Sequence, residues 1–154
     1  MLDTISRHIL QILQEKARIP NVEMARQVGM APSGVLERVR KLEKQGFIDG
    51  YEVRLNPEKF GYPVLAFIQV ELPDADAHVS VRTRLADLPG VLELHTIAGH
   101  DGLLLKVRAR SLVGLDALVH ETLLPMAPGI RTRTMIVMAT DKETSRLPLD
   151  AVGE

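Results

Sequence analysis

The first 60 residues place apolar side chains at helical spacing in three consecutive stretches. The first stretch follows a possible cap at Asp3 and ends near Pro20, the second is broken by Gly29, and the third opens at Pro32 and ends at Gly46. The pattern predicts three helices. Their buried faces would consist of Ile5, Ile9, Ile12, Leu13, Val22, Ala25, Val28, Val35, Val39 and Leu42.

A turn signal follows the third helix. Asp49-Gly50 lies between two short apolar segments, Phe47-Ile48 and Tyr51-Glu52-Val53. An Asp-Gly pair in this setting is typical of a tight β-hairpin, so we expect a small wing here. The next segment, about residues 54–63, is rich in proline and glycine and predicts a linker.

The second half of the chain alternates strand and helix patterns. The predicted order is strand 64–72, helix 76–88, strands 91–98 and 103–109, a helix capped by Ser111, and strand 130–139. This β-α-β-β-α-β order is typical of the ferredoxin-like fold, in which two helices cover one face of an antiparallel sheet.

The predicted fold class is therefore α+β, in two domains. A winged helix-turn-helix domain would occupy residues 1–60, a ferredoxin-like βαββαβ domain residues 64–140, and a polar, proline-containing tail residues 141–154. The tail can be a free end or a short arm over a neighbouring subunit.

The predicted sheet is apolar on both sides. In the first strand Ala66, Ile68 and Val70 alternate with Leu65 and Phe67, and the last strand also has apolar residues on both sides. Two helices can cover only one of these faces, so the other needs a partner. A second copy of the chain is the simplest cover, and we expect a homodimer through the open sheet face.

Composition narrows the class of protein. Hydrophobic residues make up 45% of the chain and charged residues 25%, which favours folded cores over disorder. The chain has no cysteine, so disulfides, thiolate metal sites and cysteine nucleophiles are excluded. Residues 1–6 lack the basic start of an export signal, and no apolar run approaches the roughly 18 residues of a membrane span. We expect a cytoplasmic protein with no membrane partner.

Charge alone does not identify a nucleic-acid binder. Residues 1–60 hold 10 Lys and Arg against 8 Asp and Glu, or +2, and the remaining residues hold 9 against 12, or −3. The case for DNA depends on spacing instead.

The arrangement of the three predicted helices is that of a helix-turn-helix. Residues 21–46 combine a short helix, a turn at Gly29 and a longer helix, which is what major-groove binding requires. Ser33, Gly34 and Glu37 would lie near base edges. Four basic residues of the same helix are placed to bind phosphates or guanines, and Arg26 is placed to contact the DNA backbone. These four are Arg38, Arg40, Lys41 and Lys44.

A simpler alternative is that these charges form the solvated face of an ordinary helix. Glu37 would repel phosphate, unless it faces a cytosine amino group or pairs with Lys41 one turn away. The three-helix spacing together with the Asp-Gly turn favours double-stranded DNA as the partner.

An ordered set of segments resembles the leucine-responsive/asparagine regulator (Lrp/AsnC) family over nearly the whole chain. The segments are Leu2-Asp3, Ile9-Leu10, Leu13, 25–29, 35–43, 46–51, Asn56-Pro57, Phe60-Gly61, 88–91, Ala98-Gly99 and 103–107. The resemblance implies a transcription regulator, not an enzyme, that dimerises through its C-terminal sheet and often forms tetramers or octamers. It also implies an amino-acid effector bound near the loop between the second and third strands. One departure is Ala31, where the family usually has a Ser or Thr cap.

The loop in question is Gly99-His100-Asp101-Gly102. Its glycines allow a close backbone approach to a ligand, its N–H groups can hold a carboxylate, and Asp101 can hold an ammonium group. The same residues also suit a plain hairpin turn. The aspartate stands one place earlier than in many members of the family.

An enzyme on the same architecture is the alternative function. Sirohaem decarboxylases resemble this family in fold, and His95, His100, Arg131 and Arg133 are conceivable ligands for an acidic tetrapyrrole. No tight metal-ligand motif or nucleophile–base pattern accompanies them, so we predict neither a metal nor a cofactor.

Overall fold

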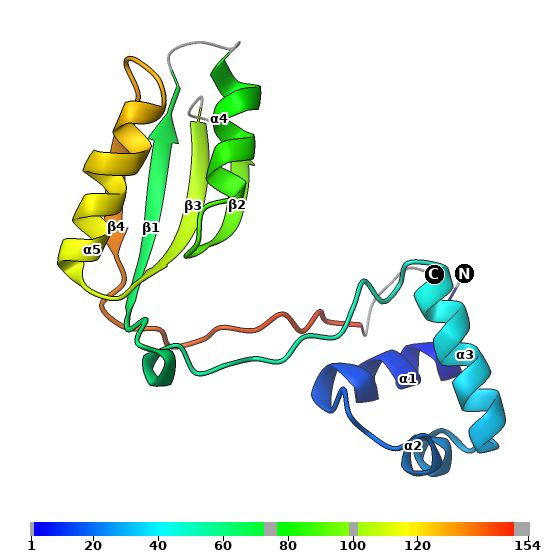
Figure 1. Cartoon of the computed structure of the whole chain (residues 1–154). Coiled ribbons are helices and arrows are strands. Elements are labelled where there is room, and N and C mark those ends of the chain that lie inside the picture. Colours follow the sequence, from blue (N-terminus) through cyan, green and yellow to red (C-terminus); the bar gives the residue numbers. More distant parts are fainter. Residues whose placement is uncertain (1, 73–76, 99–101, 150–154) are drawn as a thin grey trace. The chain divides into compact units, whose positions relative to one another are not determined.

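The structure, a computed structural model, describes residues 2–72, 77–98 and 102–149. Its internal contacts divide the chain into two units. Unit 1 consists of Met1–Arg54 together with Lys142–Glu154, and unit 2 consists of Leu55–Asp141 (Figure 1). Each unit has its own hydrophobic core. The C-terminal segment thus groups with the N-terminal helices.

Unit 1 contains the three predicted helices, α1 (Thr4–Glu15), α2 (Asn21–Val28) and α3 (Pro32–Lys44). Asp3 caps α1, because its Oδ1 accepts a hydrogen bond of 2.7 Å from the Ser6 amide. Gly29 ends α2 with φ +68°, in the left-handed region that glycine adopts at little cost. Ala31 gives α3 no side-chain cap, and Pro32 starts that helix at a position where no N–H is needed.

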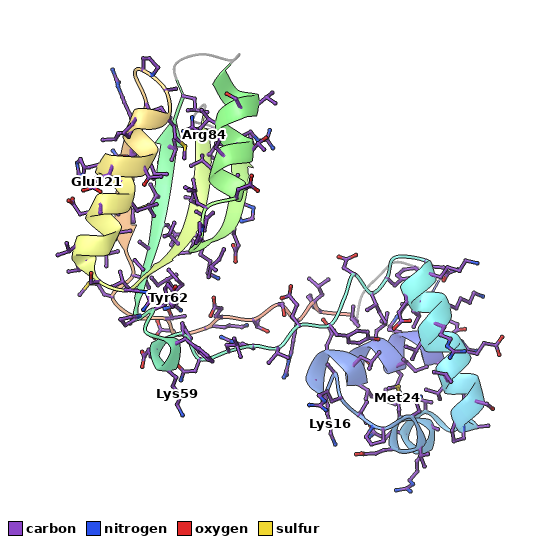
Figure 2. All side chains as sticks on the ribbon, in the orientation of Figure 1. Lys16, Met24, Lys59, Tyr62, Arg84 and Glu121 are labelled. Atoms are coloured by element: carbon purple, nitrogen blue, oxygen red, sulfur yellow. The ribbon has the colours of Figure 1, made fainter. Side chains whose placement is uncertain are left out.

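Four buried side chains pack between the three helices. Ile9, Met24 and Val35 are at most 1% exposed and Leu42 is 2% exposed, and Met24 points into the space between the helices in Figure 2. Burial of each such side chain contributes about 1.5–3 kcal/mol. Because Val35 and Leu42 fix one side of α3, the opposite side of that helix has to face solvent.

The hairpin predicted at Asp49-Gly50 is wrong. Residues 47–53 contain no strand, and neither Asp49 nor Gly50 has the positive φ that a type I′ turn requires. The side chain of Tyr51 contacts α3 instead, where its hydroxyl donates a 2.9 Å hydrogen bond to Glu43.

Unit 2 has the predicted β-α-β-β-α-β order. Its elements are η1 (Glu58–Phe60), β1 (Val64–Glu71), α4 (Ala77–Ala86), β2 (Val91–Ile97), β3 (Gly102–Ala109), α5 (Leu112–Ala117), the π-helical η2 (Leu118–Leu123), η3 (Leu124–Met126) and β4 (Arg131–Ile136). The four strands form an antiparallel sheet in the order β2-β3-β1-β4. The predicted α+β fold is confirmed.

The two faces of the sheet differ. The core face carries Ile68, Val70 and Leu105 and packs against Leu85 of α4 and Leu123 of η2, and both helical layers lie on that side in Figure 1. No described helix packs on the other face. There Phe67 of β1 lies opposite Lys106 of β3 and Met135 of β4, and Met135 is 44% exposed.

Candidate nucleic-acid interface

The exposed side of α3 carries most of the residues predicted to bind DNA. Ser33, Glu37, Arg40 and Lys44 are all exposed, and their spacing of four, three and four residues puts them on one stripe of the helix. At about 100° per residue, this stripe lies opposite the buried Val35. The helix therefore presents two cations, one carboxylate and a hydroxyl to solvent along a single line.

The remaining predicted residues lie beside this stripe. Lys41 is exposed on one flank of α3, Gly34 is half-buried, and Arg26 is exposed in the last turn of α2. A Cβ at Gly34 would lie 3.1 Å from Cε of Met30, the flexible end of a half-buried side chain.

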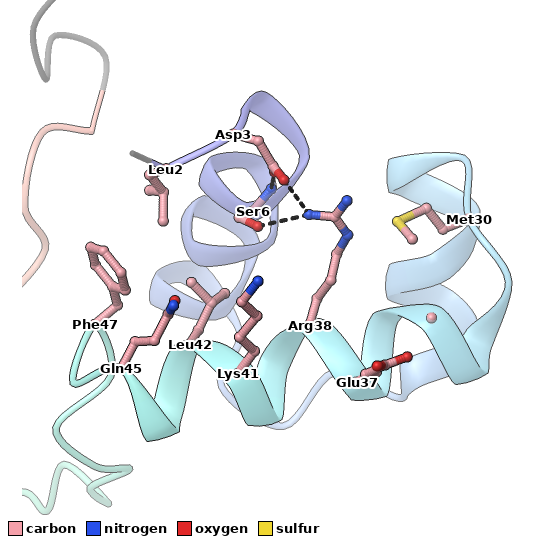
Figure 3. Close-up of a pocket in the computed structure, with 11 residues that line it drawn as sticks. Leu2, Asp3, Ser6, Met30, Glu37, Arg38, Lys41, Leu42, Gln45 and Phe47 are labelled. Carbon is pink, nitrogen blue, oxygen red and sulfur yellow. Dashed lines mark hydrogen bonds and ion pairs between the residues drawn. The ribbon is translucent and has the colours of Figure 1, made fainter.

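Arg38 is the exception within the predicted set, because its guanidinium turns toward the first turn of α1 (Figure 3). Its Nη1 donates to Asp3 Oδ2 at 2.5 Å and to Ser6 Oγ at 3.0 Å. Asp3 therefore caps α1 with one carboxylate oxygen and binds α3 with the other. The two helices are 35 residues apart at this contact, so no local pattern could have revealed it.

This ion pair also changes the acidity of Asp3. The hydrogen bond from Arg38, followed by that from the Ser6 amide, lowers the pKa of Asp3 from 3.8 to about 2. Asp3 therefore remains a carboxylate well below neutral pH and neutralises one of the cations predicted for the DNA face.

A groove of about 640 Å³ lies between the first turn of α1 and α3. Leu2, Met30 and Phe47 give it apolar walls, and Lys41 and Glu37 stand along it in Figure 3. The groove therefore belongs to the flank of the exposed stripe. The ion pair between Asp3 and Arg38 forms part of its lining.

Of the predicted effector residues, Gly99, His100 and Asp101 lie outside the described residues. Gly102 is the first residue of β3 and is buried. A Cβ on Gly102 would lie 2.6 Å from the carbonyl oxygen of Val70, so glycine is required here for β3 to approach β1. This packing role is independent of any ligand.

The residues considered for a tetrapyrrole do not converge. His95 lies on β2, where its Nε2 is 3.1 Å from Glu93 Oε2, and Lys106 Nζ is 3.0 Å from Glu93 Oε1. His95 and then Lys106 lower the pKa of Glu93. Arg133 lies on β4, at the opposite edge of the sheet, which is about 14 Å away at the usual strand spacing. His100 is outside the described residues.

The described residues contain no group of three or more His, Cys, Asp or Glu side chains that could hold a metal ion. None of their helices is both long and apolar enough to cross a membrane.

Comparison with known proteins assigns both units to families. Residues 2–49 match the model for winged helix-turn-helix DNA-binding domains, and residues 65–147 match the Lrp/AsnC ligand binding domain. The chain is 40% identical over 149 residues to the leucine-responsive regulatory protein of Escherichia coli K12, covering 95% of this chain and 90% of that protein.

Solved structures agree with these matches. A transcriptional regulator from Neisseria meningitidis in complex with L-methionine superposes with a TM-score of 0.92 at 31% identity, covering 97% of this chain and 98% of that one. A feast or famine regulatory protein from M. tuberculosis complexed with L-methionine gives 0.88 at 30% identity, covering 96% and 99%. These relatives are regulators, which supports that function over the decarboxylase alternative.

Proposed function

The chain belongs to the Lrp/AsnC family of DNA-binding transcription regulators, and we propose that the exposed stripe of α3 reads its operator. Residues near the start of a recognition helix contact base edges. Ser33, Gly34 and Glu37 stand there, and Glu37 can accept a hydrogen bond from a cytosine amino group. Arg26, Arg40, Lys41 and Lys44 bind phosphates, which fixes the register of the protein on the duplex.

The observation that carries this proposal is the alignment of exposed Ser33, Glu37, Arg40 and Lys44 on the side of α3 opposite its buried residues. Footprinting on the promoters of its own and neighbouring genes tests it. We expect a protected pseudo-palindromic site, and Glu37→Ala should alter which base is preferred while leaving phosphate contacts intact. Unchanged base preference in Glu37→Ala, Ser33→Ala and the double variant would refute this orientation of α3.

Unit 2 is the proposed sensor of an amino acid. Two relatives were solved with L-methionine bound, and we propose Gly99, His100, Asp101 and Gly102, between the end of β2 and the start of β3, as the site. Asp101 would pair with the ligand ammonium group and backbone N–H groups with its carboxylate. A ligand that binds only the folded state raises the melting temperature.

A thermal-shift screen with L-methionine and the other amino acids tests the sensor. We expect a saturable rise that Asp101→Ala abolishes and that Asp116→Ala, a substitution at an exposed residue of α5, preserves. A screen with no rise for any amino acid would end this part of the proposal.

We also propose that two copies join through the open sheet face around Phe67 and Met135, and that dimers assemble into tetramers or octamers. The half-apolar character of that face supports the dimer. A cytoplasmic location follows from a function on the chromosome.

A further inference from the structure

Residues 142–149 return from unit 2 to the DNA-binding unit. Gln14, on α1, holds them through its side-chain amide. Its Nε2 donates to the Leu147 carbonyl oxygen at 3.2 Å, and its Oε1 accepts from the Leu147 amide at 2.6 Å. The glutamine thus pairs with both backbone groups of one residue, as a neighbouring strand would. This contact recognises the backbone of the segment and not the side chain of Leu147, which is itself 69% exposed.

The segment has two further attachments to unit 1. Leu149 is half-buried and packs against the core that contains Ile9 and Ile12. At the other end of the segment, Arg54 Nη2 is 2.9 Å from Glu143 Oε2, and Arg54 Nη1 donates to the Glu143 carbonyl oxygen at 3.1 Å. A pair this exposed stabilises little by itself, but it joins the residue at which the chain leaves unit 1 to the segment that returns.

We propose that residues 142–149 form a strap that completes the DNA-binding unit, with Gln14 and Arg54 as its receptors. The sensor unit is then joined to the DNA-binding unit by two covalent crossings instead of one. Two crossings restrict how freely the units reorient, which lowers the entropy lost when both halves of a dimer engage one operator. The strap therefore supports DNA affinity without touching DNA, and Gln14 is a positioning residue.

A matched pair of substitutions in the full-length protein tests the strap. Leu147→Ala keeps the backbone groups that Gln14 binds, whereas Leu147→Pro removes the amide that donates to Oε1. Gln14→Ala removes both bonds from the other side. Trypsin cleavage after Lys142, followed by mass spectrometry, reports release of the strap. Cleavage after Arg146 is not compared, because in Leu147→Pro that bond precedes proline and trypsin does not cut it. Fluorescence anisotropy with promoter DNA reports affinity.

We expect cleavage to accelerate roughly fivefold for each hydrogen bond lost, and DNA affinity to fall several-fold in Leu147→Pro and Gln14→Ala. Leu147→Ala should match the parent protein in both measurements. Circular dichroism checks that the helices persist. We expect them to, because neither backbone group of Leu147 is needed to maintain a helix. Equal behaviour of Leu147→Ala and Leu147→Pro would overturn the proposal. Protection that vanishes on dilution would also overturn it, because the strap would then come from another copy of the chain.

Discussion

Removal of Asp3 should loosen α1 and α3 together. Asp3→Ala deletes both the helix cap and the ion pair with Arg38, whereas Asp3→Asn keeps a good cap and deletes only the charge. A lost cap costs about 1 kcal/mol. The ion pair adds less than about 1 kcal/mol, because the Asp3 side chain is 55% exposed and solvent screens it. We expect a loss of about 1–2 kcal/mol for Ala and under 1 kcal/mol for Asn.

Hydrogen exchange of the α1 amides measures this local stability directly. At neutral pH the Ala variant should exchange roughly 5–30 times faster than the parent and the Asn variant less than about fivefold faster, since 1.4 kcal/mol is tenfold. The folded-state pKa of Asp3 lies below its ordinary value, so its contribution is present above about pH 3.8 and is lost as pH falls toward 2. Parental exchange rates in both variants at pH 7, or an Asn effect that persists below pH 2, would refute the reasoning.

Two further predictions concern unit 2. Met135→Glu places a charge on the open sheet face and should convert dimers to monomers in analytical ultracentrifugation. The control Val113→Glu, at a position 80% exposed on α5, should leave the dimer intact. Dimers that survive Met135→Glu would show that this face is not the interface. Gly102→Ala drives a Cβ to 2.6 Å from the Val70 carbonyl and should cost about 1–3 kcal/mol, or roughly 5–15 °C in calorimetry. Gly114→Ala, with only an ordinary 3.5 Å contact to Ser111 Oγ, should be neutral or stabilising, and equal melting temperatures for the two variants would show that β3 can move away from β1.

Local pattern was enough to predict the helices and strands. Asp3, Gly29, Pro32 and Ser111 each mark an end through chemistry contained within a few residues. Alternation of side chains along β1 also distinguishes its two faces.

The features that sequence did not reveal depend on contacts between distant residues. Arg38 has the position of a DNA contact on the helix, but its partner Asp3 is 35 residues away. Leu147 is 133 residues from Gln14, so the C-terminal segment had no pattern that would assign it to unit 1. The hairpin at Asp49-Gly50 failed because neither residue adopts the positive φ that a type I′ turn requires.

The salt dependence of DNA binding tests the central claim most directly. With promoter DNA, log K should fall linearly with log salt, and each lost phosphate contact should reduce the slope by about 0.9. Arg40→Ala/Lys44→Ala removes two such contacts per protomer, or four per dimer, and should therefore lower the slope by about 3.6, while Arg82→Ala, at an exposed residue of α4, leaves it unchanged. A double variant that keeps the parental affinity and slope would show that α3 does not face DNA in this way.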